Sequence, residues 1–283
     1  MLVPVRTSGT KPPLYFIHGL IGFMSIGRFL AQALGQDQPF YCINANNIDS
    51  RGTTKPGGVK DMALGYVEEI LRAQPNGPLL IGGMCVGGLA AIEVVRELQA
   101  RGREVGPVIL ADPPTVPPGF IKQNQTVNPH DAQVAAQLYE RVRGQLLERA
   151  SISYADLPFE PDDQTQVHLA TLAGVNSLVA LSRHVPEVFP GATVMILSIA
   201  HAPGIFHPQM HWIKLLPQAP TAHVLPCTHR EMFRSARHDF ARVLKFVLEG
   251  AINAGTRAES AAGPTLHRHD DASIRRTAGL DGP

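Results

Sequence analysis

A cysteine between glycines follows a short apolar run and precedes a helical pattern. Residues 79–89 read LLIGGMCVGGL, in which 79–81 predict a buried strand and 83–87 form a Gly-x-Cys-x-Gly pattern. Such glycines permit the sharp strand-to-helix turn of a nucleophile elbow, which exposes the central side chain and points the next backbone N–H at the same space. The pattern predicts that Cys85 is a nucleophile, with a small buried core cysteine as the alternative.

Sulfur at the elbow affects the second half of the reaction. The thiolate is the reactive form, and free cysteine titrates near ~8.5, so a neighbouring imidazolium is needed to hold a useful thiolate fraction at neutral pH. A thioester formed on Cys85 from a thioester substrate keeps most of the energy of the bond that it replaces. An oxygen ester would have lost part of that energy. The cysteine therefore affects which nucleophiles can accept the acyl group in the second half-reaction.

A carboxylate and a histidine follow Cys85 in the order that such an elbow requires. Asp112 ends the predicted strand 107–111, whereas residues 188–230 contain the next strand, 192–197, and no Asp or Glu. Asp112 is therefore the acid by elimination. His229 lies between the last predicted strand and the terminal helix, where the base is expected. The alternatives are a cap or turn role for Asp112 and a surface position for His229.

These residues predict a Cys-His-Asp triad. We expect Asp112 to orient His229, which takes the proton of Cys85, and the thiolate to attack an acyl carbonyl. The backbone N–H groups of Leu20 and Val86 are expected to hold the oxyanion. His229 then activates the nucleophile that discharges the acyl group. His18 is expected to shape the oxyanion loop rather than to transfer protons.

Other histidines follow the predicted sheet without an obvious role. His201 and His223 have no metal-ligand spacing, and His207 and His211 stand at i, i+4. Two zinc ligands could share a helix face at that spacing, but no third ligand is evident, so a metal is not expected. Trp212 is expected to be a packing residue rather than a substrate contact.

Short apolar strands alternate with amphipathic helices along the chain. This alternation predicts an α/β fold with a mostly parallel sheet covered by helices on both faces. A strand is expected at 14–17, before the strand 79–81 that leads into the elbow. The remaining expected elements are a strand at 41–44 and helices at 23–34, 59–73, 86–100 and 231–248.

The sheet pattern lapses between residues 113 and 190. Two helices are predicted there, 131–148 and 164–181, and their position directly after the acid predicts a lid over the site at 114–190. The alternative is two ordinary packed helices. The α/β domain is expected to span 1–250, and the Ala/Gly/Ser-rich segment 251–283 is expected to be a disordered tail.

Composition is typical of a soluble enzyme. The chain has 283 residues, of which 44% are hydrophobic and 17% charged, enough apolar material for one large domain. The net charge of +1 suggests neither a nucleic-acid nor a membrane partner. Three cysteines without metal spacing favour reduced thiols in the cytoplasm, and no signal peptide or membrane helix is expected.

The chain resembles the thioesterase domains that release products from nonribosomal peptide and polyketide assembly lines, and their stand-alone relatives. The resemblance runs from about Leu2 to Gly250 and implies an α/β-hydrolase fold. This chain departs from the family pattern in its Cys85, where serine is usual, and in its Thr228, where glycine is common. The matching features are LYFIHG at 14–19, the elbow at 83–87, Asp112 after the sixth strand, FPGATV at 189–194, Trp212, and Thr228-His229 before Glu231-Met232-Phe233.

The resemblance and the elbow leave three functions open. The first is hydrolysis of an acyl or peptidyl thioester carried on the phosphopantetheine of a carrier protein or on coenzyme A. The second is delivery of the acyl group from Cys85 to an amine or hydroxyl, including macrocyclisation. The third is a non-catalytic binding protein. A carboxylate nucleophile is lacking at the elbow, which excludes dehalogenase and epoxide hydrolase chemistry. No cofactor is expected, and the expected partners are a carrier protein and a small-molecule acyl thioester.

Overall fold

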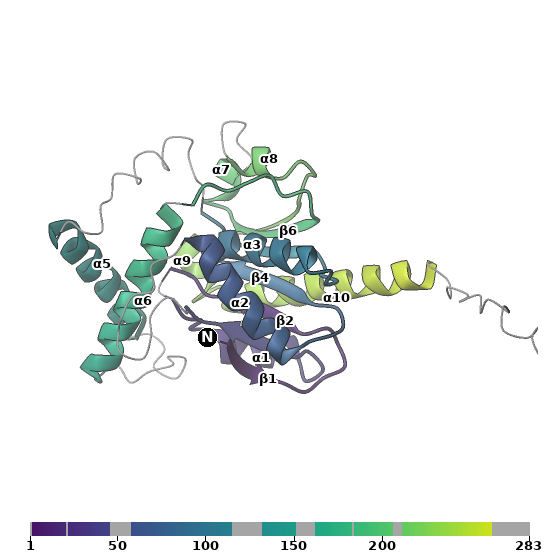
Figure 1. The fold of residues 1–283 in the computed structure, drawn as a ribbon, viewed down its shortest axis with the longest axis horizontal. Helices are drawn as coiled ribbons and strands as arrows, with labels where there is room; N and C mark the ends of the chain where they lie inside the picture. The colour runs from purple at the N-terminus through teal and green to yellow at the C-terminus, as the bar shows by residue number, and fades with distance from the viewer. Residues whose placement is uncertain are drawn as a thin grey trace, which may run out of the picture.

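A computed structural model describes residues 2–20, 22–45, 58–114, 132–150, 162–182, 184–205 and 211–261. Within these residues, seven strands form one sheet in the order β1-β3-β2-β4-β5-β6-β7 (Figure 1). β1 pairs with β3 antiparallel, and the other neighbours pair parallel. The strands are β1 Leu2–Arg6, β2 Leu14–Ile17, β3 Phe40–Ile43, β4 Leu80–Met84, β5 Val108–Ala111, β6 Thr193–Ser198 and β7 Thr221–Leu225.

The central strands are short apolar runs because both faces of the sheet are covered. All residues of β2 (LYFI), β4 (LIGGM) and β5 (VILA) are buried. Continuous apolar runs of this kind are typical of parallel strands between two helical layers, since neither face meets water. The expected mostly parallel α/β architecture is confirmed.

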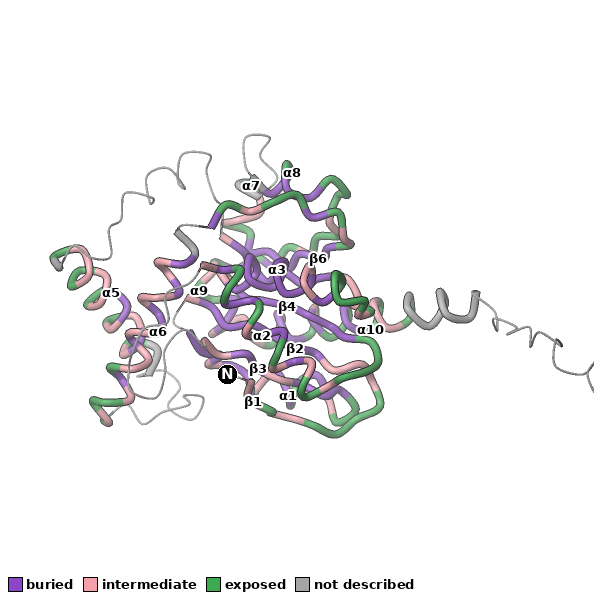
Figure 2. The backbone as a smooth tube through the Cα atoms, in the orientation of Figure 1, coloured by how far each residue is buried: buried purple, intermediate pink, exposed green. Residues whose placement is uncertain are grey.

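Helices pack on both faces of the sheet. One face carries α2 Val59–Ala73 and α3 Gly87–Ala100, whose apolar residues form a core cluster with α8 His211–Leu215. The other face carries α1 Gly27–Leu34 and α10 Arg237–Ala261, which form a second cluster. Figure 2 shows the buried chain concentrated in the sheet between these layers. The shorter α7 Ala202–Ile205 and α9 His229–Met232 follow β6 and β7.

The segment predicted as a lid contains two helices in its described parts. α5 Ala132–Ala150 and α6 Gln164–Ser182 lie together at one side of the sheet (Figure 1). A small apolar cluster of Phe23, Leu146 and Val167 joins them to the loop before α1. The two helices therefore have the predicted positions, and the lid role stays a prediction.

Several predicted boundaries are wrong. The expected helix 231–248 is divided: α9 ends at Met232, and α10 begins at Arg237 and runs to Ala261. Residues 251–261 are thus helical, not part of a disordered tail, because Ala251 and Ile252 still pack against the core. Residues 262–283 lie outside the described residues.

Two further differences concern the ends and numbering of elements. The first helix begins at Gly27 rather than at residue 23. Phe23, Met24 and Ile26 are buried although they lie in the loop before it, so their apolar character does not indicate a helix. The strand before Asp112 is the fifth of the described strands, not the sixth.

None of the described helices is long and apolar enough to span a bilayer.

Candidate active site

Cys85 is the first of the two residues, Cys85 and Val86, that turn the chain from β4 into α3. β4 continues to Met84, and Cys85 has a φ of 53°, a left-handed conformation that costs a non-glycine residue about 1 kcal/mol or more. Its N–H donates to Ala111 O over 2.8 Å and its carbonyl accepts from Gly88 N over 3.0 Å. The strand, turn and helix of the predicted elbow are therefore present, and the nucleophilic role of Cys85 stays a prediction.

The glycines of the elbow are required by close backbone approaches. A β-carbon at Gly83 would lie 2.2 Å from Gly87 O, and one at Gly87 would lie 2.1 Å from His18 O. Both separations are far below van der Waals contact. Only hydrogen fits at these positions, which lets the elbow pack directly against the loop that follows β2.

Asp112 lies at the carboxyl end of β5, beside the elbow. It is fully buried with a φ of 47°, and its Oδ1 accepts a hydrogen bond from Ser198 N over 2.7 Å. Its Oδ2 accepts from His229 Nδ1 over 2.6 Å. Burial alone would raise the pKa of Asp112, but the bonds from His229 and Ser198 hold it below its ordinary value. Asp112 is thus fixed as a carboxylate against the imidazole.

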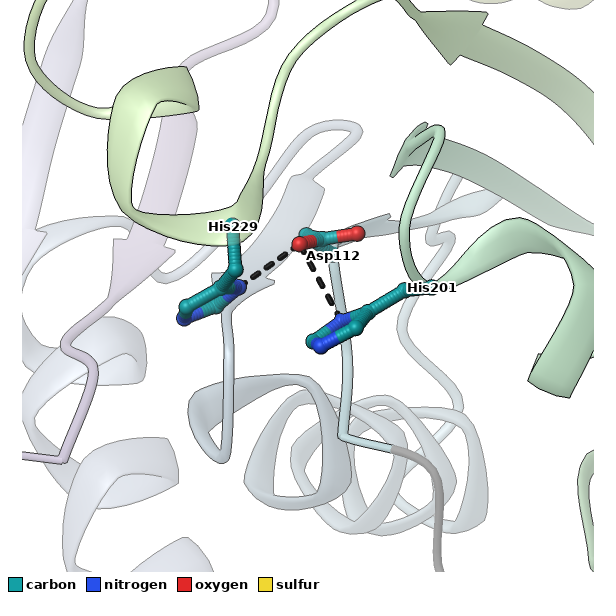
Figure 3. Close-up of side chains that lie close together, drawn as sticks. All are labelled: Asp112, His201 and His229. Carbon is teal, nitrogen blue, oxygen red and sulfur yellow. Dashed lines mark hydrogen bonds and ion pairs between the residues drawn. The ribbon is translucent and has the colours of Figure 1, made fainter.

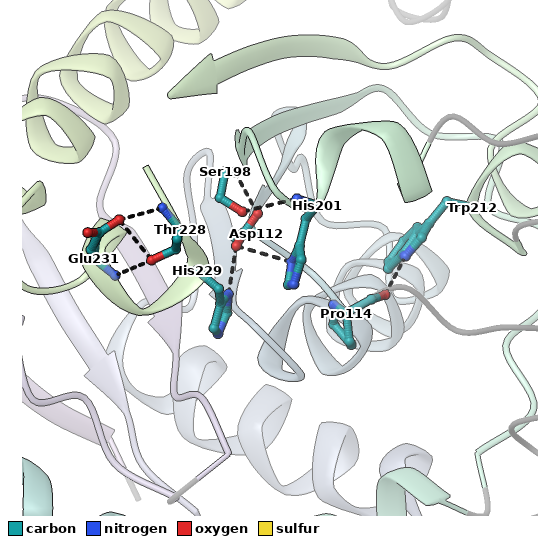
Figure 4. Close-up of polar contacts among 8 residues, drawn as sticks. All are labelled: Asp112, Pro114, Ser198, His201, Trp212, Thr228, His229 and Glu231. Carbon is teal, nitrogen blue, oxygen red and sulfur yellow. Dashed lines mark hydrogen bonds and ion pairs between the residues drawn. The ribbon is translucent and has the colours of Figure 1, made fainter. Parts of the chain in front are cut away.

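His229 is the first residue of α9 and is oriented by a helix cap. Thr228 caps α9: its hydroxyl accepts from Glu231 N over 3.4 Å, while Glu231 Oε2 accepts from Thr228 N over 2.8 Å (Figure 4). Thr228 therefore has a structural role as the cap of this helix. Glu231, the nearest acid to His229 in sequence, is occupied by this cap rather than by the imidazole.

The surroundings of His229 favour its protonated form. Burial lowers the pKa of His229, but the hydrogen bonds and negative charges of Asp112 and Cys85 outweigh burial and raise it to about 9. A protonated imidazole beside a cysteine favours the thiolate, the nucleophilic form of sulfur. The arrangement can therefore support a thiolate and imidazolium pair.

A second histidine lies against the same carboxylate. His201 Nδ1 is 3.2 Å from Asp112 Oδ2, and its ring stacks on that of His229 with centroids 5.1 Å apart at 25° (Figure 3). The sequence prediction gave His201 no role. The pairing of β5 with β6 explains the position of His201. Ala111 pairs with Ile196, so residues just after β6 lie beside Asp112.

Asp112, His201 and His229 also form a group that could hold a metal ion. However, the 2.6 Å between His229 Nδ1 and Asp112 Oδ2 is a hydrogen-bond distance. Ligands of a tetrahedral zinc ion lie about 3.3 Å apart, given bonds of about 2.0 Å. The observed geometry is that of a carboxylate bonded to imidazole.

His18 supports the loop that follows β2. Its ring is buried, with Nδ1 2.6 Å from Gly19 O and Nε2 2.8 Å from Tyr66 Oη. Burial lowers the pKa of His18 to about 4, so the ring stays neutral, donates to Gly19 O and accepts from Tyr66. These contacts fix the loop bearing Leu20, and the oxyanion role of that loop stays a prediction.

The other singled-out residues lie away from the triad. Trp212 is buried in the core and donates from Nε1 to Pro114 O over 2.8 Å, so its packing role is confirmed (Figure 4). His223 packs edge-on against Phe246. His207 lies outside the described residues, and so does the side chain of His211, which leaves that pair undescribed.

Cys85, His229 and Leu20 line one cavity of about 920 Å³. α5 contributes Gln145 and Glu148 to its wall, so the helical insertion borders the site. Within the described residues, the backbone N–H groups of Leu20 and Val86 donate no hydrogen bond. Both are available to an oxyanion, and that assignment stays a prediction.

The carboxyl edge of this doubly covered, mostly parallel sheet carries an elbow, a buried carboxylate and a histidine. Together they define an α/β-hydrolase fold. The chain belongs to the thioesterase domain family, whose model matches residues 12–248.

Two relatives are named as a synthetase and a synthase. Malpibaldin synthetase of Mortierella alpina is 36% identical over 112 residues, covering 40% of this chain and 2% of that protein. A dimodular nonribosomal peptide synthase of Bacillus subtilis (strain 168) is 32% identical over 135 residues, covering 48% of this chain and 6% of that protein. The chain thus spans a small fraction of the length of these relatives.

Solved structures share the fold. The NocB thioesterase domain, in covalent complex with a fluorophosphonate nocardicin G analogue, aligns with a TM-score of 0.63 at 22% identity. The alignment covers 88% of this chain and 99% of that domain. At this identity the similarity shows the fold alone.

Proposed function

We propose that the chain is a thioesterase that releases an acyl or peptidyl group from a carrier-protein or coenzyme A thioester through an acyl-Cys85 intermediate. One observation carries the proposal. His229 is hydrogen-bonded to buried Asp112 over 2.6 Å, and His229 and Cys85 line the same cavity. This is the relation that an acyl-transfer triad needs, with the base held by the acid and facing the nucleophile.

In the first half-reaction, the Cys85 thiolate attacks the acyl carbonyl. A bond forms between Cys85 Sγ and the carbonyl carbon, the bond from that carbon to the carrier sulfur breaks, and the imidazolium of His229 protonates the departing thiolate. The backbone N–H groups of Leu20 and Val86 stabilise the negative oxygen of the tetrahedral intermediate. The products are a free carrier thiol and acyl-Cys85.

The second half-reaction needs a neutral imidazole. Acylation removes the thiolate, which is one of the causes that raise the pKa of His229, so that pKa falls in the acyl-enzyme. His229 then takes a proton from the incoming nucleophile, which attacks the carbonyl and displaces Cys85. With water, the products are a free acid and the regenerated thiol.

The nucleophile's sulfur supports a second candidate, transfer to an amine or hydroxyl. Acyl-Cys85 retains the energy of a thioester, so aminolysis or closure of a strained ring stays favourable from it. The products would be an amide, ester, lactam or lactone. Non-catalytic binding is the weakest candidate, since it leaves the juxtaposition of Cys85, His229 and Asp112 without a use.

Carrier delivery is proposed from the relatives. One of them is named as a nonribosomal peptide synthase and another as a synthetase, and this chain matches a small segment of each. A substrate presented on a phosphopantetheine arm would bring its own thioester, so the proposed reaction uses no further cofactor.

Intact-protein mass spectrometry after incubation with acyl-pantetheine thioesters tests the proposal. Acylation should add one acyl mass, localised by proteolysis to Cys85, and the adduct should decay as free acid or as an amine or alcohol conjugate appears. Cys85→Ala should acquire no adduct. No acylation of the wild-type chain by any thioester in the panel, or an adduct that persists in Cys85→Ala, contradicts the proposal.

A further inference from the structure

Three arginines lie on the wall of the catalytic cavity. Arg230, Arg234 and Arg237 follow His229 within residues 230–237 and line the same 920 Å³ cavity as Cys85. They come from α9, the turn after it and the first residue of α10. The break between the two helices thus places three arginines on one cavity wall.

The cavity wall has an excess of positive charge. Glu148 is the sole carboxylate among its described lining residues, and it forms an ion pair with Arg230. No ion pair joins Arg234 or Arg237 to another described residue. Two cationic side chains on the cavity wall are therefore left without an ion-pair partner among the described residues.

The environment of these arginines favours an anionic ligand. Partial burial and the charge of Arg230 lower the pKa of Arg234, which means that its positive charge lacks a compensating neighbour. Arg237 is held in place by the Phe29 ring, whose centroid is 4.6 Å from the guanidinium carbon. An anion entering here would find cations already positioned.

We propose that Arg234 and Arg237 bind an anionic group of the thioester substrate, a phosphate or a carboxylate. The inference rests on the proposed thioesterase function and specifies its substrate. Guanidinium groups bind both anions through paired hydrogen bonds. The phosphate would be that of the phosphopantetheine arm, and the carboxylate would belong to the acyl chain.

An acidic protein surface fits the site less well. Arg234 and Arg237 are half-buried in a cavity that also contains the catalytic cysteine, whereas a docking protein surface needs cations that project into solvent. A group that enters with the substrate can reach them. The matched control is Arg242 on α10, which is exposed and paired with Asp239 outside the cavity lining.

Four substrates separate the two anions. The same neutral acyl group is presented on phosphopantetheine and on pantetheine, and pantetheine also carries a short acyl group with and without a terminal carboxylate. Arg234→Gln and Arg237→Gln should each lower kcat/KM roughly tenfold or more for the thioester bearing the recognised anion. Both variants should leave kcat/KM for the two neutral pantetheine thioesters unchanged, and Arg242→Gln should leave kcat/KM for all four substrates unchanged.

Binding supplies a readout that is independent of turnover. Calorimetry with phosphopantetheine, pantetheine and a free dicarboxylate should detect one anion that binds the wild-type chain and Cys85→Ala alike but binds Arg234→Gln weakly. If the wild-type chain turned over none of the thioesters but still bound the anion, the proposed function would be contradicted and the anion site would stand. Equal losses for neutral and anionic substrates in the arginine variants would overturn the anion site. So would effects that are absent with all four substrates and appear only when the acyl group is presented on a carrier protein, which would indicate a protein-docking surface.

Discussion

His201 Nδ1 lies 3.2 Å from Asp112 Oδ2, the same oxygen that accepts the hydrogen bond from His229. The acid of the proposed triad therefore faces two imidazoles rather than one. A positive charge on His201 would help to neutralise Asp112, and this would weaken the stabilisation that Asp112 gives to the imidazolium of His229. We infer that His201 is a positioning residue that tunes the basicity of His229.

Replacing His201 by phenylalanine should keep the ring stacked on His229 and remove the Nδ1 that faces Asp112. Because the 2.6 Å bond from His229 to Asp112 remains, we expect kcat to fall by less than roughly tenfold. The pKa of His229 should rise, because Asp112 then serves that ring alone. The pH profile of kcat/KM measures this shift, and His223→Phe, which alters a ring packed on Phe246, is the control. An unchanged profile contradicts the role of His201.

The nucleophile prediction concerns three cysteines in different surroundings. Burial raises the pKa of Cys42 to about 12, and burial also raises the pKa of Cys227, whereas Cys85 is half-buried at a cavity. Iodoacetamide should therefore modify Cys85 first, as read by peptide mapping. Cys85→Ala should lower turnover by roughly 10⁴-fold or more with the fold retained. Uniform labelling of the three thiols, or an active alanine variant, excludes the assignment.

The acid prediction compares two carboxylates near His229. Asp112→Asn should lower kcat by roughly 10⁴-fold, because an amide cannot hold the imidazole in the same tautomer and charge state. Glu231→Gln keeps a side chain that can accept the hydrogen bond from Thr228 N in a capping box, so it should change both stability and kcat little. Steady-state kinetics and thermal unfolding of both variants check this. A larger kinetic effect at Glu231 would reverse the assignment.

The turn at Cys85 and the position of Asp112 at a strand end were predictable because local sequence determines them. Glycines on both sides of Cys85 and an apolar run ending in Asp112 identify the ends of two strands. His201 was missed because its position depends on the pairing of β5 with β6, which brings residues far apart in the chain to one edge. The same holds for the arginine-lined cavity wall, since the break between α9 and α10 interrupts a continuous helical pattern.

The raised pKa of His229 has a consequence for stability. A histidine whose pKa is 6.5 when unfolded and about 9 when folded binds its proton more tightly in the folded chain. Its contribution to the free energy of unfolding is fully present below pH 6.5 and is lost as the pH rises through about 9. The stability difference between wild type and His229→Gln should shrink over that range, as measured by urea unfolding. His223→Gln is the control, and a difference that grows with pH contradicts the shift.

Cys85→Ser tests why the nucleophile is sulfur. The two side chains are nearly isosteric, so the elbow should keep its geometry, but the intermediate becomes an oxygen ester. Serine also depends wholly on a neutral His229 for activation. Loss of the thiolate removes one cause of the raised pKa of that histidine, so acylation by the serine variant should still occur at neutral pH.

The products of the two forms then distinguish hydrolysis from transfer. If the enzyme delivers its acyl group to an amine or closes a strained ring, the serine variant should acylate and then stall, or yield free acid, because an ester lacks the driving force for those steps. If water is the natural acceptor, both forms should give the same acid from one thioester substrate. Product analysis by liquid chromatography with mass spectrometry, with Cys85→Ala as the blank, decides between them. Identical acid at comparable rates would remove the case for transfer or cyclisation and leave hydrolysis as the function.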